Sequence, residues 1–178
     1  MSLTTAAATA RRLVEPVLTV VFPSACACCG RLLAQPTRGP LCRPCWDALP
    51  RHRGPACQCG LPRPPGRPTC GRCRRGRQPF AAGVSLGPYE GSLRAVIHEL
   101  KYRGRRRVAA RLAEALLEDE PTRILVAVSE LLVPVPLHPR RLRERGFNQA
   151  ALIARDLGSR TGRTCGDRAL VRRKDTAP

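Results

Sequence analysis

The sequence predicts a chain of two kinds of structure, a small cysteine-rich region held together by metal and an α/β domain with a parallel sheet. Nine of the ten cysteines fall between Cys26 and Cys73, where apolar periodicity is weak. Beyond Pro79 helical periodicity appears, and an apolar run precedes a further helix, as in α/β domains. The predicted division is an N-terminal helix at 1–25, a cysteine-rich region at 26–78 and an α/β domain at 79–178.

The first 25 residues predict a short helix and not a secretion signal or a membrane anchor. A basic pair followed by an apolar run is typical of a signal peptide, but Glu15 and Pro16 interrupt the run. A transmembrane helix takes about 20 apolar residues, and this run is much shorter. We therefore expect no membrane span and a cytoplasmic location.

Two closely spaced cysteine pairs open the cysteine-rich region. They are Cys26-x2-Cys29 and Cys42-x2-Cys45, with twelve residues between the pairs. Pairs of this kind place four thiolates within reach of one Zn²⁺. The alternative is a disulfide framework, which is typical of oxidising compartments. Because no convincing signal peptide precedes the cysteines, the spacing favours zinc.

A second set of four cysteines follows, with a shorter first pair. Cys57-x-Cys59 is separated by ten residues from Cys70-x2-Cys73. The first pair is one residue short of a C-x2-C knuckle, so this site departs from the usual ligand spacing. Each set would give all four zinc positions to thiolates, which predicts structural metal, since a catalytic site keeps one position open. Chelation is expected to unfold 26–73.

The α/β domain shows a succession of turn signals and apolar periods. It predicts short strands at 81–91, helices at 92–104 and 106–118, a buried strand at 124–135 and a helix at 148–160. Ser92 is placed as the N-cap of the first of these helices. Asn148 is placed as the cap of the last, and the long strand is expected to end at Val135.

The chain is strongly basic, with a formal net charge of +19. Such a charge suits a nucleic acid or a phosphorylated small molecule, because it attracts polyanions at range. Aromatic residues make up only 3%, which leaves few members for a platform that stacks single-stranded bases. The charge therefore permits DNA binding but does not establish it.

Arginines are concentrated in the connection between the predicted long strand and the last helix, in the segment VPVPLHPRRLRERGFNQ at 133–149. Open α/β sheets hold phosphate-bearing ligands at such strand-to-helix connections, since strand ends and helix N-termini meet there. The planar guanidinium meets phosphate oxygens bidentately. Arg143 and Arg155 are expected on solvated faces.

Several segments together resemble the ComF family of phosphoribosyltransferase-like proteins, which is associated with natural competence and DNA uptake. They are FPSACACCG, LCRPC, CQCGLP, CGRC, YEGSLRAVIHELKYRG and VPVPLHPRRLRERGFNQA. The match covers nearly the whole chain in the family's order. It implies a double zinc ribbon, with two structural zinc ions, followed by a type I phosphoribosyltransferase fold. In that fold a parallel sheet binds phosphoribosyl pyrophosphate and Mg²⁺.

The resemblance also implies a pyrophosphate site in the loop after the long strand. The candidates are Leu137, His138, Arg140, Arg141 and Arg145. In the second ribbon Ala56 stands where the family's first ligand falls, and Cys57 is displaced by one. The 178 residues hold no strand ending in an acidic pair and no TTGxT-like loop, and the acidic cluster Glu118–Glu120 is interpreted as a solvated helix end. We therefore expect a C-terminally truncated domain that is inactive as a transferase.

A different function is also compatible with the sequence, a nucleic-acid-binding zinc protein in which the α/β part is a scaffold. Its phosphate contacts would be Arg63, Arg67, Arg72, Arg74, Arg75 and Arg77. Single-stranded DNA and the DNA-uptake machinery are the expected partners. Salt dependence of DNA binding separates this alternative from a phosphoribosyl pyrophosphate site.

Overall fold

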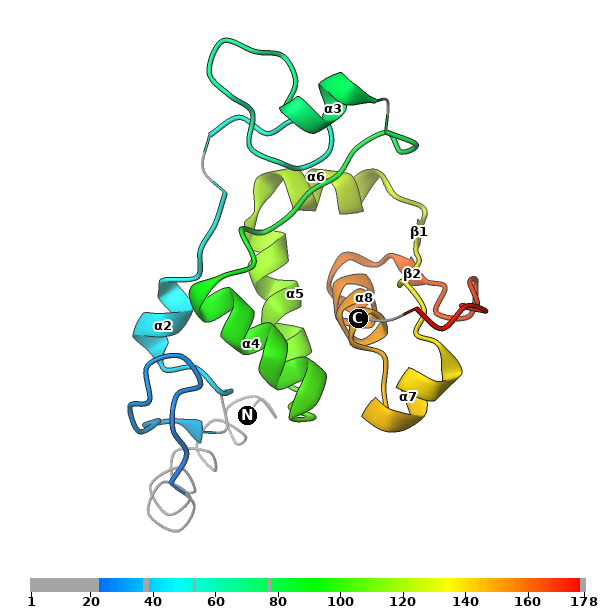
Figure 1. The fold of residues 1–178 in the computed structure, drawn as a ribbon. Coiled ribbons are helices and arrows are strands. Elements are labelled where there is room, and N and C mark those ends of the chain that lie inside the picture. Colours follow the sequence, from blue (N-terminus) through cyan, green and yellow to red (C-terminus); the bar gives the residue numbers. More distant parts are fainter. Residues whose placement is uncertain (1–22, 37–38, 53, 77, 177–178) are drawn as a thin grey trace, which may run out of the picture. The chain divides into compact units, whose positions relative to one another are not determined.

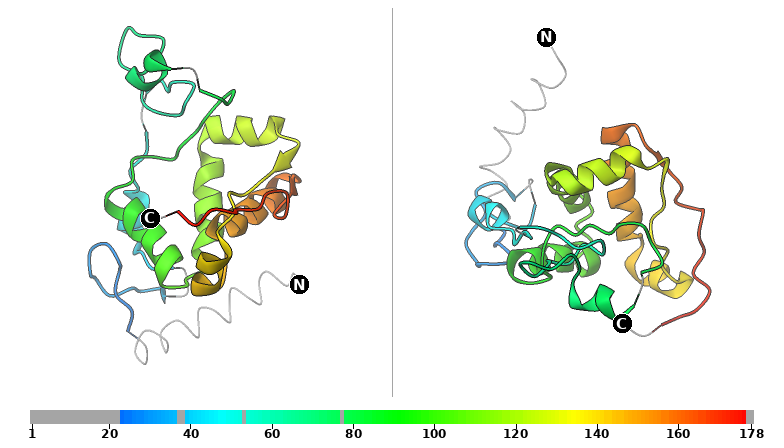
Figure 2. Two further views of the ribbon diagram at one scale, coloured as in Figure 1. Left: turned by 45° about the vertical axis from the view of Figure 1, so that its right-hand side comes forward. Right: turned by 90° about the horizontal axis from the view of Figure 1, so that it is seen from above.

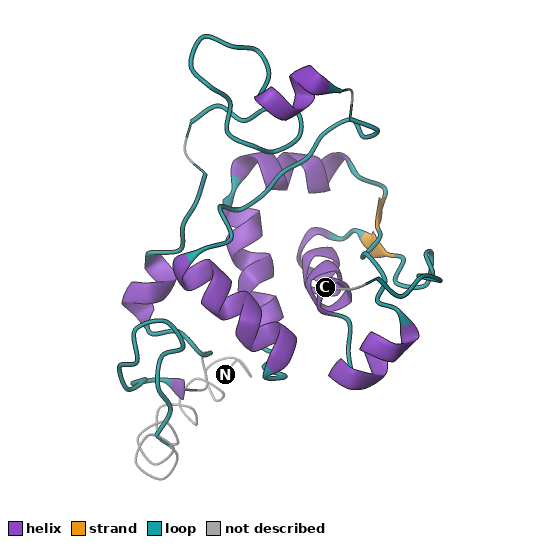
Figure 3. Cartoon of the chain, in the orientation of Figure 1, coloured by secondary structure: helices purple, strands orange, loops and turns teal. Residues whose placement is uncertain are grey.

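Helices dominate the computed structural model, which describes residues 23–36, 39–52, 54–76 and 78–176 (Figures 1 and 3). The predicted N-terminal helix falls almost entirely outside these ranges. The elements are α2 (Arg43–Asp47), α3 (Gly71–Arg75), α4 (Gly91–Tyr102), α5 (Val108–Glu118), α6 (Glu120–Val128), β1 (Leu131–Leu132), α7 (Pro139–Arg145), α8 (Gln149–Thr161) and β2 (Thr164–Cys165). No helix in the described ranges is long and apolar enough to cross a bilayer.

The chain divides into two compact units, each made of two stretches of sequence. The first unit combines the residues up to Leu49 with Tyr89–Val108, and the second combines Pro50–Pro88 with the residues from Ala109 on. The first unit carries the buried face of α4, with Val96 and Leu100 almost fully enclosed.

The sheet is a parallel pair in the second unit. Leu131 pairs with Thr164 and Leu132 with Cys165, and α7 and α8 form the connection between the two strands. Gly158 lets α8 lie against the chain that enters β2, because a side chain there would meet the Arg163 carbonyl oxygen at 2.5 Å. The expected parallel pairing is therefore present, in a sheet of two short strands within the described residues.

The strand predicted at 124–135 is correct only in part, because residues 124–128 belong to α6 and only Leu131–Leu132 form a strand, β1. Asp119 caps α6, accepting hydrogen bonds from the Thr122 amide at 3.1 Å and its hydroxyl at 2.6 Å. Pro121 lies in the first turn, where a missing N–H costs nothing. Periodicity alone does not separate a buried strand from a short buried helix. Val135, the predicted strand end, lies in a loop and is 69% exposed.

The short strands predicted at 81–91 are also absent. Residues 81–86 run as an extended segment along the second ribbon, where Gly83 N donates to the Gln58 carbonyl oxygen at 2.7 Å. Ser92 is not the cap of α4, because the helix begins at Gly91 and Glu90 takes the N-cap position. The buried Ser92 hydroxyl instead donates to the Ala48 carbonyl oxygen at 3.3 Å.

The other predicted helices are confirmed as α5 and α8. Asn148 caps α8, as predicted, with its side-chain oxygen accepting from Ala150 N at 2.9 Å. Gly162 ends the helix in the left-handed region, with φ of 70°, as a C-terminal glycine commonly does.

Candidate functional site

The eight predicted zinc ligands form two clusters of four sulfurs. One consists of Cys26, Cys29, Cys42 and Cys45, and the other of Cys57, Cys59, Cys70 and Cys73; within each, all four sulfurs lie within 4.8 Å of one another. Four sulfurs bound to zinc at 2.3 Å would lie about 3.8 Å apart. The Cys29–Cys42 sulfurs are 3.7 Å apart and the Cys59–Cys70 sulfurs 3.5 Å. All ten cysteines are free of disulfides, so the donor sets fit tetrahedral zinc.

The two ribbons repeat one backbone plan despite their different knuckle lengths. Gly30 N donates to the Cys26 carbonyl oxygen at 2.9 Å, and Gly60 N donates to the Cys57 carbonyl oxygen at 2.8 Å. Both glycines have positive φ, 73° and 79°. The first turn, from Cys26 to Gly30, contains five residues and the second, from Cys57 to Gly60, contains four, so the second ribbon accommodates its shorter knuckle within the turn.

Hydrogen bonds to sulfur show that Cys57 is the equivalent of Cys26. Cys42 N donates to the Cys26 sulfur at 3.4 Å, and Cys70 N donates to the Cys57 sulfur at 3.3 Å. A five-residue helix follows in each ribbon, α2 after Cys42 and α3 after Cys70. The displacement of Cys57 along the sequence therefore does not remove it from its cluster.

In each cluster, hydrogen bonds from the backbone lower the pKa of at least one thiol, which favours its thiolate form. Burial raises the pKa of Cys26, but hydrogen bonds from backbone N–H groups of the same ribbon outweigh it and bring the pKa to about 6. Backbone N–H groups of Cys70 and Cys59 likewise lower the pKa of Cys57 to about 6. Burial and neighbouring thiols raise the pKa of Cys73 to about 12. A bound cation would favour ionisation of all four thiols, and four thiolates leave no open position, so the fitting metal is structural.

The arginine corner, residues 137–145, follows β1 after a short loop. His138 caps α7, its Nδ1 accepting from Arg140 N at 3.4 Å. Asn148 Nδ2 donates to the Val135 carbonyl oxygen at 3.0 Å, which ties the start of α8 to the loop. Leu137 and His138 are half-buried. Arg140 and Arg141 stand in the first turn of α7, whereas Arg145 lies in its last turn, so the structure places Arg145 at the other end of the helix.

Carboxylates already contact the guanidinium groups of this corner. Glu144 lies 3.1 Å from Arg140 and 3.4 Å from Arg141. Residues 166–176, red in Figure 2, return past α7, and Asp175 lies 3.8 Å from both His138 Nδ1 and Arg140 Nη1. A phosphate ligand would have to replace these carboxylates.

Arg143 and Arg155, which we expected on solvated faces, are both exposed. Arg155 also has a specific partner, because its guanidinium forms an ion pair with Asp167. Hydrogen bonding from Arg155 holds the pKa of the Asp167 carboxyl below its ordinary value.

The described arginines of the second ribbon differ from those of the corner, because none of them forms an ion pair with a described carboxylate. Arg72, Arg74 and Arg75 lie on α3, are exposed, and form no ion pair with any residue that the structure describes. Arg67 is exposed and Arg63 half-buried. Arg77 lies outside the described residues.

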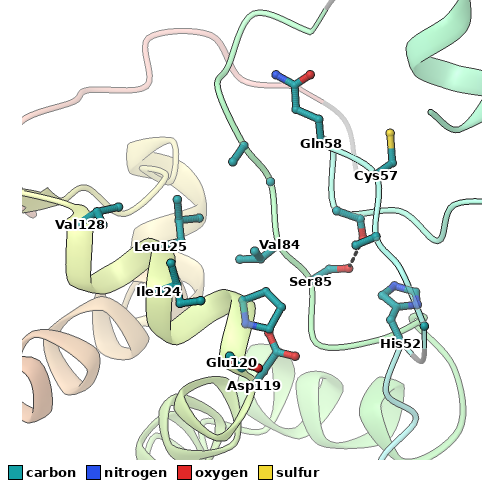
Figure 4. Close-up of a pocket in the computed structure, with 16 residues that line it drawn as sticks. His52, Cys57, Gln58, Val84, Ser85, Asp119, Glu120, Ile124, Leu125 and Val128 are labelled. Carbon is teal, nitrogen blue, oxygen red and sulfur yellow. Dashed lines mark hydrogen bonds between the residues drawn. The ribbon is translucent and has the colours of Figure 1, made fainter. Parts of the chain in front are cut away.

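A cavity of about 480 Å³ lies in the second unit, between the second ribbon, residues 82–85 and α6 (Figure 4). Ile124, Leu125 and Val128 line its helical side. On the opposite side the Ser85 hydroxyl donates to the Gly60 carbonyl oxygen at 3.3 Å. None of the candidate arginines within the described ranges lines this cavity. The sequence did not reveal it because the apolar face of α6 was assigned to a strand.

Comparisons with known proteins agree with the ribbon geometry. The family model of the double zinc ribbon domain matches residues 17–74. The DNA utilization protein YhgH of Salmonella typhi is 34% identical over 168 residues, and that of Escherichia coli K12 is 32% identical over 165. Each alignment covers 89% of this chain and 70% of the relative. No solved structure matches the chain significantly.

Proposed function

Because the chain belongs to the ComF family, as its relationship to the YhgH proteins shows, we propose that it takes part in the use of DNA taken up by the cell. In this proposal the two ribbons are structural zinc modules. The arginine corner binds the diphosphate of phosphoribosyl pyrophosphate, together with Mg²⁺. The observation that carries the corner's role is its position, one short loop after β1 of a parallel pair.

The corner supplies two kinds of group suited to a diphosphate. Arg140 and Arg141 are adjacent guanidinium forks at the start of α7, and forks of this kind bind phosphate oxygens bidentately. Their present partners, Glu144 and Asp175, are only partly buried, with side chains 45% and 37% exposed. Exposed ion pairs contribute about 0–1 kcal/mol, so a diphosphate carrying several charges can displace them. Mg²⁺, when bound, would offset part of the ligand's negative charge.

Isothermal calorimetry with phosphoribosyl pyrophosphate and Mg²⁺ tests this site. The variant Arg140→Ala/Arg141→Ala is expected to bind at least about a hundredfold more weakly, since each charge-assisted contact contributes about 1.5–3 kcal/mol. Arg143→Ala, an exposed arginine of the same helix, is the matched control and is expected to bind like the wild type. Equal binding by the double variant and the wild type would exclude the corner.

Pyrophosphate release tests the expected inactivity of residues 1–178. Two residues of the acidic cluster Glu118–Glu120 have structural contacts. Asp119 caps α6, and Glu118 pairs with Arg51 at 2.7 Å. These carboxylates are therefore not arranged as a Mg²⁺ site. We expect this chain to release no pyrophosphate in the presence of Mg²⁺ and an amine or base acceptor, and a measurable release would contradict that expectation.

A second function, the binding of nucleic acid by the second ribbon, is favoured by the arginines of α3, which form no ion pair with a described residue. For a single-stranded ligand, the slope of log K against log salt becomes about 0.7 less steep for each phosphate contact that is removed. Arg72→Ala/Arg74→Ala/Arg75→Ala should therefore lower the slope of log K against log salt by about 2. Arg43→Ala is the matched control, because Arg43 lies on the equivalent helix α2 and is already paired with Asp47 at 3.3 Å. An unchanged slope in the triple variant would reject this function for α3.

A further inference from the structure

The outward face of α4 combines aromatic and cationic side chains. Leu93, Val96 and Leu100 are buried on one side of the helix. Arg94, His98, Lys101 and Tyr102 are spaced at i, i+4, i+7 and i+8, a spacing that places them together on another side. These four residues and Tyr89 are called the tyrosine face.

Both tyrosines of the chain belong to this face and both are exposed. Tyr89 is 55% exposed and Tyr102 is 59% exposed. Lys101 Nζ lies 5.6 Å from the centre of the Tyr89 ring. The His98 and Tyr102 rings are 4.6 Å apart between centres, with their planes at 46°. Each ring is thus supported from within the same unit while much of its surface stays open to a ligand.

The charge around the two rings is positive on balance. Residues 89–108 contain six basic and two acidic side chains. Of the two acids, Glu99 is buried and already engaged by Arg103 at 3.5 Å and Arg105 at 3.1 Å. Arg94 and Lys101 form no ion pair within the described ranges. A polyanion reaching this face would meet cations directly beside exposed rings.

We propose that the tyrosine face binds single-stranded nucleic acid, with bases stacked on Tyr89 and Tyr102 and phosphates held by Arg94 and Lys101. Open rings next to cations match the two components of a single strand, a base with two flat faces and a charged backbone. A duplex hides its base faces and would use only the cations. This inference rests on the proposed function only for the source of the nucleic-acid strand. The tyrosine face and α3 lie in different segments of the sequence.

Binding of labelled oligothymidylate to the full, zinc-loaded chain tests the proposal by fluorescence anisotropy. Tyr89→Leu/Tyr102→Leu keeps apolar bulk but removes the rings, and its affinity is expected to fall at least tenfold. Tyr89→Phe/Tyr102→Phe keeps the rings and should bind within about twofold of the wild type. Phe80→Leu removes an aromatic residue that is 43% exposed in the other unit, and it should have no effect. Zinc content and circular dichroism check that each variant is folded.

An abasic strand of equal length separates stacking from charge. It offers the same phosphates without bases, so the leucine variant and the wild type should bind it equally. Oligouridylate is measured in parallel, because RNA and DNA both present base faces, and the tighter strand identifies the natural ligand. Equal binding of oligothymidylate by the leucine variant and the wild type would overturn the stacking surface while leaving the corner and α3 untouched. The stacking surface would also be overturned if the leucine variant lost affinity for the abasic strand or for duplex DNA as much as it lost affinity for oligothymidylate.

Discussion

A glycine-to-alanine substitution should have different effects in the two ribbons, although each ribbon has a glycine with positive φ after its first knuckle. The substitution at Gly60 is expected to be the more costly one. A Cβ added at Gly60 would lie 2.9 Å from the Gly83 carbonyl oxygen and 3.1 Å from Val84 Cα, both backbone atoms that cannot rotate away. A Cβ at Gly30 would meet nothing within 4 Å. Gly30→Ala therefore isolates the backbone cost, and Gly60→Ala adds the clash with residues 81–86.

The magnitude follows from the contacts that the clash would break. An L-residue in the left-handed region costs about 1–2 kcal/mol, which is the full effect expected for Gly30→Ala. In the second ribbon, moving residues 81–86 away would also lose the bond from Gly83 N to Gln58 at 2.7 Å and the Ser85–Gly60 bond at 3.3 Å. At about 0.5–1.5 kcal/mol each, these raise the expected cost of Gly60→Ala to about 2–5 kcal/mol.

Hydrogen exchange of the zinc-loaded chain measures both variants locally. In Gly60→Ala the protection of the Gly83 amide should fall about a hundredfold or more, since each 1.4 kcal/mol is tenfold. In Gly30→Ala the Gly30 amide should lose only about tenfold. Gly83→Ala is a third variant, because its Cβ would lie 2.9 Å from the Cys59 carbonyl oxygen without a positive φ. If the Gly30 and Gly60 variants lost equal protection, residues 81–86 would not be fastened to the second ribbon as the structure shows.

Three other perturbations have expected outcomes. Chelation of zinc should abolish exchange protection across 26–73 while α8 keeps its own, because metal binding supplies about 10–16 kcal/mol to small zinc modules; retained protection in a metal-free chain would contradict the zinc assignment. Asn148→Ala should lower the free energy of unfolding by about 1 kcal/mol, whereas Asn148→Asp keeps the cap and loses only the donor to Val135, so thermal melts should rank the alanine variant lower. The Asp167 carboxyl has its pKa lowered in the folded state by Arg155, so its stabilising effect is complete above its ordinary value of 3.8 and is lost as the pH falls through the lower folded value. Arg155→Ala should raise the NMR titration midpoint of Asp167 towards 3.8, and an unchanged midpoint would show that the ion pair does not form in solution.

The elements that the sequence predicted well are those whose signals are local. Asn148 and Gly162 mark both ends of α8 within the helix's own neighbourhood, and the cysteine spacings bring the ligands of each ribbon together by short turns. The first part of the strand predicted at 124–135 is a helix instead, and a local signal marks it: Asp119 with Thr122 three residues later, and Pro121 between them, is a helix start. Without this capping signal, the apolar run from Ile124 on was interpreted as a strand.

Other features depended on contacts between distant parts of the chain and were not predictable. Residues 81–86 lie extended because they pair with the second ribbon, and no local pattern shows that partner. The equivalence of Cys57 and Cys26 appears in hydrogen bonds that only the folded ribbon shows, such as the one from Cys70 N to the Cys57 sulfur. At the arginine corner, the sequence showed the cations but not that Asp175, far along the chain, lies beside two of the candidates.

A net charge of +19 says less about a ligand than the pairing of the individual arginines does. Arg51 is used within the fold, donating to the Ala115 carbonyl oxygen at 3.3 Å and pairing with Glu118. The corner arginines share Glu144, so their attraction for a phosphate is reduced by the carboxylate that they must release. The cations of α3 and the tyrosine face have no such competitor among the described residues. Long-range attraction of nucleic acid should therefore originate at α3 and α4, and removing the corner arginines should leave the salt slope of DNA binding nearly unchanged.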